Sequence, residues 1–145
     1  MSLPAIVIDT NVVLDWLLFD DPSVQVLAAA VVARQVDWIA TAEMRDELAH
    51  VLHRGLAALH SVEAAWVLAA FDARVRQVPC PQPLPHAPGW LCSDPDDQKF
   101  VDLARSAGAR WLLSRDRAVL KLSRRARQAG WQIGLPAAWR GADPD

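Results

Sequence analysis

The amino-acid sequence predicts one α/β domain built around a parallel β-sheet. Short apolar runs, several of them rich in β-branched residues, alternate along the chain with segments of helical periodicity, and the connections between them are short. This alternation is typical of parallel strands joined by helices. A length of 145 residues fits one domain that can bury its own core without disulfides.

The first half of the chain alternates strands with helices. Ala5–Ile8 is a β-branched apolar run, as expected for a strand buried on both faces. Thr10 or Asn11 can cap the helix that follows, in which apolar residues recur at helical spacing. Pro22 lies where that helix ends and can open another over residues 23–35. The next expected elements are a strand over 36–40, a helix over 42–53, a helix over Ser61–Arg74 and a short strand over 75–78.

The second half begins with a proline-rich connection. Residues 79–90 include five prolines, a density that excludes a regular helix or strand. This segment is either a plain connector or a flap beside a substrate. Gly108 and Gly130 are expected to end two helices. The remaining expected elements are a helix over 96–107, a strand over 111–114, a helix over 117–129 and a last strand over 131–134.

The composition indicates a soluble globular protein of the cytoplasm. Apolar residues make up 52% of the chain and charged residues 22%, which is ordinary for a globular domain. No apolar run approaches the roughly 18 residues that a membrane helix needs. The first residues carry no basic segment or cleavage signal. Cys80 and Cys92 are expected to be free thiols, as in a reducing compartment.

Basic residues concentrate toward the C-terminus. Nine of the fifteen Lys and Arg residues lie between positions 103 and 142, where Asp116 is the one acidic residue. Such a tract around a lone carboxylate suits a polyanionic substrate that approaches a metal site. The alternative is that these cations are only the solvated face of a helix.

Acidic residues follow the ends of two expected strands. Asp9 comes directly after the first strand and Asp116 after the fourth. Because the carboxyl ends of parallel strands form one edge of the sheet, where ligands bind, these carboxylates are expected to converge. Hard oxygen ligands suit Mg²⁺ or Mn²⁺, and such a cluster is suited to metal-assisted phosphodiester hydrolysis.

Further acidic residues lie near expected helix starts. Glu43 and Glu47 share one face of the helix over 42–53, so either could reach the site. Asp94, Asp96 and Asp97 lie where another helix begins, and some of them are expected only to satisfy the helix dipole. These patterns leave the choice open within both groups.

Several other kinds of site lack their motifs. The chain has no phosphate-binding glycine loop, no HExxH zinc motif and no GxSxG nucleophile turn. Asn11 stands where an aspartyl-phosphate phosphatase would carry its second Asp, so the expected general acid is missing. Trp90 is a candidate for stacking on a nucleic-acid base, whereas most of the seven tryptophans are expected in the core.

Four short motifs together resemble the PIN domain family. They cover about residues 5–139 of a single domain spanning 1–145, and they come in the order typical of that family. Within it, the chain looks like the VapC-type toxins of bacterial toxin–antitoxin systems. The motifs are Ile6-Val7-Ile8-Asp9-Thr10-Asn11-Val12, Glu47-Leu48 with Val51-Leu52, Asp94-Pro95-Asp96-Asp97-Gln98-Lys99-Phe100 with Leu103-Ala104, and Trp111-Leu112-Leu113-Ser114-Arg115-Asp116.

The resemblance implies a three-layer α/β/α fold and a ribonuclease that depends on Mg²⁺ or Mn²⁺. Arg115 departs from the family pattern, in which a small residue is more usual, and a cation here could narrow the metal site or bind a substrate phosphate. By position, the catalytic and metal-binding residues would be Asp9, Glu47, Asp97 and Asp116. The supporting polar residues would be Thr10, Asn11 and Ser114. The residues expected to hold the RNA backbone are Arg115, Arg117 and Lys121.

The expected function is therefore endonucleolytic cleavage of RNA by the toxin of a toxin–antitoxin pair. The implied partners are the RNA substrate, a cognate antitoxin protein and a second copy of the chain in a homodimer, with no membrane. The alternative is a non-catalytic RNA- or protein-binding module with the same fold. A DNA nuclease of the flap-endonuclease type would need added elements for which 145 residues leave little room.

Overall fold

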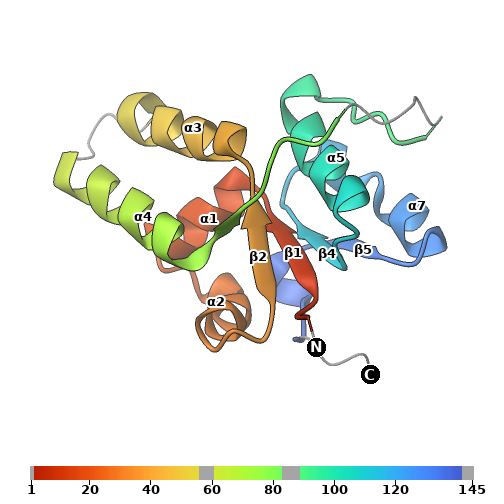
Figure 1. Cartoon of the computed structure of the whole chain (residues 1–145), viewed down its shortest axis with the longest axis horizontal. Helices are drawn as coiled ribbons and strands as arrows, with labels where there is room; N and C mark the ends of the chain where they lie inside the picture. Colours follow the sequence, from red (N-terminus) through yellow and green to blue (C-terminus); the bar gives the residue numbers. More distant parts are fainter. Residues whose placement is uncertain (1, 56–60, 83–88, 142–145) are drawn as a thin grey trace.

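The computed structural model describes residues 2–55, 61–82 and 89–141 and shows a parallel sheet between two layers of helices (Figure 1). The five strands lie in the order β3-β2-β1-β4-β5, and every neighbouring pair is parallel. The expected three-layer α/β/α fold is thus confirmed. The strands are β1 (Ala5–Ile8), β2 (Asp37–Ala40), β3 (Arg76–Gln77), β4 (Trp111–Leu113) and β5 (Gln132–Gly134).

The helices divide between the two faces of this sheet. Figure 1 shows α1, α3 and α4 on one side of β1 and β2, and α5 and α7 on the other side. Helix α1 contacts α3 and α4, whereas α5 packs against β1 and β4 and α7 against β5. The helices are α1 (Thr10–Leu17), α2 (Gln25–Val32), α3 (Ala42–His50), α4 (Ser61–Arg74), α5 (Gln98–Ser106), α6 (Arg117–Leu120) and α7 (Ser123–Gln128).

The expected helix over 117–129 is wrong in one respect, because the structure divides it into α6 and α7. The chain leaves helical geometry at Leu122, where φ is −89° and ψ is 1°. Val119 on α6 and Ala126 on α7 are both fully buried, so each short helix packs independently on the sheet. Two other expected helices begin or end in tighter or wider turns, namely the 3₁₀ turn Pro22–Val24 before α2 and the π turn Val51–Gly55 after α3.

Tryptophan rings pack against other aromatic rings in the core. Trp38 packs against Phe71 with ring centroids 5.1 Å apart. Trp90 is 9% exposed and stacks on Trp131 at 5.4 Å, while the Arg105 guanidinium lies 4.8 Å from its ring centroid. Trp90 is therefore part of the core and offers no open ring face for a base.

Both cysteines are free, as expected, with Cys80 exposed and Cys92 buried. No helix in the described part of the chain combines the length and apolar character needed to cross a lipid bilayer.

Shortening a core side chain of the central sheet tests this packing. Leu112 lies on β4 with no exposed surface, so we expect Leu112→Ala to lower the free energy of unfolding by about 2–5 kcal/mol. Urea denaturation measures this loss. The matched control is Leu91→Ala, because Leu91 is 75% exposed and its truncation should cost less than about 0.5 kcal/mol. Similar losses in both variants would contradict the described packing.

Candidate metal centre

The centre of the sheet brings two acidic segments together. Strands β1 and β4 are neighbours in the sheet. Helix α1, which follows β1, lies on one side of the sheet, and helix α5, which precedes β4, lies on the other side (Figure 1). Such a position is where open α/β sheets bind ligands, beyond the carboxyl ends of the strands. Asp9 directly follows β1, and its N–H donates to the Leu113 carbonyl at 3.0 Å. Asp116 follows β4 after two intervening residues, Ser114 and Arg115.

Asp9 is a buried carboxylate held by two donors. Its side chain is 3% exposed, and its Oδ1 accepts a hydrogen bond from the Asn11 N–H at 2.9 Å while capping α1. Its Oδ2 accepts from the Ser114 hydroxyl at 2.7 Å. Burial raises the pKa of Asp9, the two hydrogen bonds act in the opposite direction, and the charges of Asp116 and Glu47 raise it further.

Ser114 joins the two acidic segments. Its side chain is fully buried, and its hydroxyl oxygen accepts from the Asp116 N–H at 2.9 Å while its hydrogen is donated to Asp9. The Asp116 carboxylate in turn accepts from the Ala118 N–H at 2.9 Å and caps α6. One hydroxyl thus contacts both the carboxylate of Asp9 and the backbone N–H of Asp116.

A third acidic segment completes the cluster. One carboxylate oxygen from each of Asp94, Asp97 and Asp116 lies within 4.8 Å of the other two. The Asp97 Oδ2 atom is buried and has no hydrogen-bond partner in the described part of the chain. Burial first, then the neighbouring carboxyl of Asp116 and the charge of Asp9, raise the pKa of Asp97 to about 7.

Glu47 faces the same cluster but is already paired. Its Oε1 accepts from the Lys99 ammonium at 2.7 Å, and its Oε2 accepts from the Thr10 hydroxyl. Lys99 also donates to the carbonyl of Asp96. The two glutamates of α3 therefore have different surroundings, since Glu43 lines a separate cavity.

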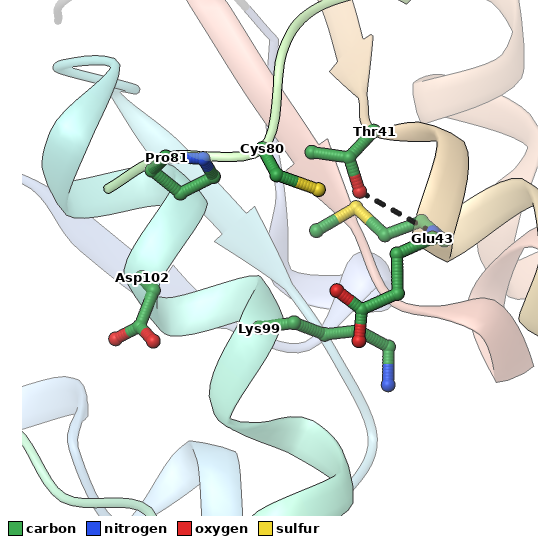
Figure 2. A pocket seen from close by; sticks show the side chains of 7 residues that line it. Thr41, Glu43, Cys80, Pro81, Lys99 and Asp102 are labelled. Atoms are coloured by element: carbon green, nitrogen blue, oxygen red, sulfur yellow. Dashed lines mark hydrogen bonds between the residues drawn. The ribbon is translucent and has the colours of Figure 1, made fainter. Parts of the chain in front are cut away.

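That cavity lies between α3 and α5 and measures about 90 Å³. Figure 2 shows Glu43 and Lys99 reaching into it from the two helices, with Cys80 on the segment that covers it. Lys99 is thus shared between the cavity and the ion pair with Glu47. The lining residues are Thr41, Glu43, Met44, Cys80, Pro81, Lys99 and Asp102.

The three expected RNA-binding cations differ in their surroundings. Arg115 pairs with Asp15 at 3.0 Å and with Asp21 at 3.7 Å, and it donates to the Ser23 hydroxyl. Its guanidinium therefore ties the end of β4 to α1 and to the turn after it. Arg117 is the first residue of α6 and follows Asp116 directly, Lys121 comes after the last residue of α6, and both are exposed.

The structure brings Asp94, which the sequence left open beside Asp96 and Asp97, into the cluster, and it adds Lys99. Asp94 caps the 3₁₀ turn Pro95–Asp97 by accepting from the Asp96 N–H at 3.0 Å. Residues three apart align in a 3₁₀ turn, which explains why Asp94 and Asp97 face the same point. The Asp-Pro sequence was the signal for this turn. No local sequence signal indicated the pairing of Lys99 with Glu47.

Comparison with known proteins identifies the family. The family model of the PIN domain matches residues 5–118. The chain belongs to the PIN domain family. Among curated proteins, none matches the chain significantly.

Among solved structures, this PIN domain is similar to a chain in the crystal structure of VapBC2 from Rickettsia felis bound to a DNA fragment from the promoter. The two chains are 10% identical, the TM-score is 0.59, and the match covers 89% of this chain and 96% of that chain. The expected resemblance to a VapC-like PIN domain is thus confirmed in fold.

The carboxylates fit a divalent cation. They offer hard oxygen ligands, and the buried Asp97 oxygen without a partner is the kind of atom that a cation would satisfy. Carboxylates this close repel one another unless a cation or a proton lies between them. The oxygens best placed to hold an ion belong to Asp94, Asp97 and Asp116, and the charge of Asp9 lies close enough to raise the pKa of Asp97.

The repulsion among these carboxylates predicts how the stability of the metal-free protein depends on pH. The pKa of Asp97 is about 7 in the folded protein, whereas that of an ordinary aspartate carboxyl is 3.8. The folded state therefore binds the proton of the Asp97 carboxyl more tightly than the unfolded state does. The contribution of that proton to stability is full below pH 3.8 and is lost as the pH rises to about 7. We expect Asp97→Asn to raise the melting temperature in EDTA by a few degrees at pH 8 and by less at pH 5.

Thermal unfolding of both proteins at the two pH values measures this effect. Asp46→Asn is the matched control, because Asp46 is an exposed carboxylate on α3. Added Mn²⁺ should then raise the melting temperature of the wild type more than that of Asp97→Asn. A lower melting temperature for Asp97→Asn than for the wild type at pH 8 would contradict the claim that repulsion among these carboxylates destabilises the metal-free protein.

Proposed function

We propose that this PIN domain is a divalent-metal-dependent endoribonuclease that acts as the toxin of a toxin–antitoxin pair. PIN domains are generally nucleases, and this chain has an acidic cluster at the ligand-binding edge of its sheet. The observation that carries the proposal is the buried Asp97 oxygen, which has no partner among the described residues although two further carboxylates lie beside it. A purely structural carboxylate would be expected to have a donor there.

Several residues in and around the cluster have a role in this proposal. Asp97 and Asp116 would hold Mg²⁺ or Mn²⁺, and Asp9 would complete the ligand set or orient a water ligand. Ser114 and the Asn11 N–H keep Asp9 in place, while Thr10 orients Glu47. A bound divalent ion would polarise the scissile phosphate and lower the pKa of a water nucleophile.

Exposed cations would hold the RNA backbone near these carboxylates. Arg117 is the first residue of α6, the helix that Asp116 caps, and Lys121 follows its last residue, so both exposed cations are within five residues of Asp116. Arg115 can contribute once its contacts with Asp15 and Asp21 exchange for phosphate. The proposed substrate is therefore RNA, bound chiefly through its phosphates.

The proposal extends to partners and place of action. One chain in the structure of VapBC2 bound to a promoter DNA fragment has a similar fold. We expect this PIN domain to bind a cognate antitoxin protein. A homodimer and a cytoplasmic location, where RNA is available, belong to the same proposal.

Cleavage of a mixed-sequence single-stranded RNA tests the activity. We expect cleavage with Mg²⁺ or Mn²⁺ and none in EDTA. Asp9→Asn should lower the rate by about 100-fold or more, because it removes a charge from the centre and weakens the hold on the metal ion. Asp46→Asn, prepared identically, should cleave like the wild type. Equal activity of the wild type and Asp9→Asn would indicate a contaminant, and no cleavage together with no metal binding would favour the binding module.

The salt dependence of cleavage tests the RNA-binding cations. Each phosphate contact with a single strand contributes about 0.7 to the slope of log affinity against log salt concentration. The double variant Arg117→Ser with Lys121→Ser should therefore reduce the slope of log kcat/KM by about 1.4. Arg74→Ser is the control, because Arg74 is exposed and precedes the start of β3, at the opposite edge of the sheet. An unchanged slope in the double variant would contradict the assignment.

A further inference from the structure

Lys99 is a cation inside the acidic centre. Its side chain is 16% exposed, and its ammonium lies 2.7 Å from Glu47 Oε1 while donating also to the Asp96 carbonyl. It therefore joins α3 to the 3₁₀ turn that carries Asp97, across 52 residues of sequence. Few lysines are this buried unless they are paired, so this contact is part of how the centre is built.

The pairing makes Glu47 different from the other acidic residues. Both of its oxygens accept hydrogen bonds, one from Lys99 and one from Thr10. Asp97, in contrast, has an oxygen that is buried without a donor. The Glu47–Lys99 pair is neutral as a unit, so the uncompensated negative charge of the centre lies on the carboxylates of Asp9, Asp94, Asp97 and Asp116.

We propose that the Lys99 ammonium takes the place of a second divalent ion at Glu47. The centre then holds one divalent ion, bound on the side of Asp97 and Asp116, and Glu47 is not among its ligands. This inference rests on the proposed metal-dependent nuclease. It differs from the expectation that all four motif carboxylates bind metal, because Glu47 would serve instead to position Lys99.

The position of Lys99 also suits contact with substrate. An ammonium has three N–H donors, and acceptors in the described part of the chain account for two of them. Lys99 also lines the cavity between α3 and α5 (Figure 2). We assign its remaining donor to a phosphate oxygen of the substrate. Two divalent ions would place positive charge on both sides of a scissile phosphate, and one ion together with Lys99 does the same.

Removing the ammonium should change the number of bound ions. Without Lys99, Glu47 would be left with the Thr10 donor alone while its charge repels that of Asp9, and a divalent ion would relieve that repulsion. We therefore expect Lys99→Met to gain a second Mn²⁺ site. Lys99→Arg keeps the charge and should keep a single site. Lys99→Met combined with Glu47→Gln should return to one ion.

The experiment is a count of Mn²⁺ per chain, by electron paramagnetic resonance of the free ion during titration of each folded variant. One ion in the wild type and two in Lys99→Met support the inference. Two ions in the wild type, or one in a folded Lys99→Met, would overturn it while leaving the proposed nuclease intact. No bound ion in the wild type would overturn the metal centre and this inference with it.

A second variant keeps the test decisive if Lys99→Met does not fold. Glu47→Gln alone should still bind one Mn²⁺ with an affinity within about tenfold of the wild type, because Glu47 is not a ligand. A ligand substitution such as Asp97→Asn should weaken that affinity by well over tenfold. Loss of the ion in Glu47→Gln as severe as in Asp97→Asn would overturn the inference.

Discussion

The crowding of carboxylates where β1 and β4 end is the constraint on which the rest of the structure depends. Asp9 is buried at this point, and Asp94, Asp97 and Asp116 gather beside it. Like charges at this spacing oppose folding, so the surrounding structure must supply donors or accept a cation. Ser114 supplies one donor to Asp9, Lys99 neutralises Glu47, and the buried oxygen of Asp97 is left for a metal ion.

The topology of the sheet explains why these residues meet. Parallel strands deliver the residues that follow them to one edge, and the central position of β1 and β4 brings Asp9 and Asp116 within reach of one hydroxyl. Helix α5 packs on these same two strands, so the turn at its start brings Asp97 to that edge. A stable scaffold of this kind can hold repelling groups that a loop could not.

Local sequence patterns predicted the strands, most helices and the positions of Asp9 and Asp116, because these depend on periodicity and on where a strand ends. They did not predict the break at Leu122, since burial on the sheet overrides the helical pattern there. The pairing of Lys99 with Glu47 depends on a tertiary contact that no spacing in the sequence records. The same holds for Arg115, which meets Asp15 and Asp21 only once α1 is packed.

Anomalous diffraction from crystals soaked in Mn²⁺ can locate the metal ion in this centre, because manganese is identified without any assumption about activity. One anomalous peak between the carboxylates of Asp97 and Asp116, with none beside Glu47, is the result that this account predicts. The absence of any peak at this edge of the sheet in well-ordered crystals would contradict the proposed metal centre, because the crowded carboxylates would then be relieved by protons alone.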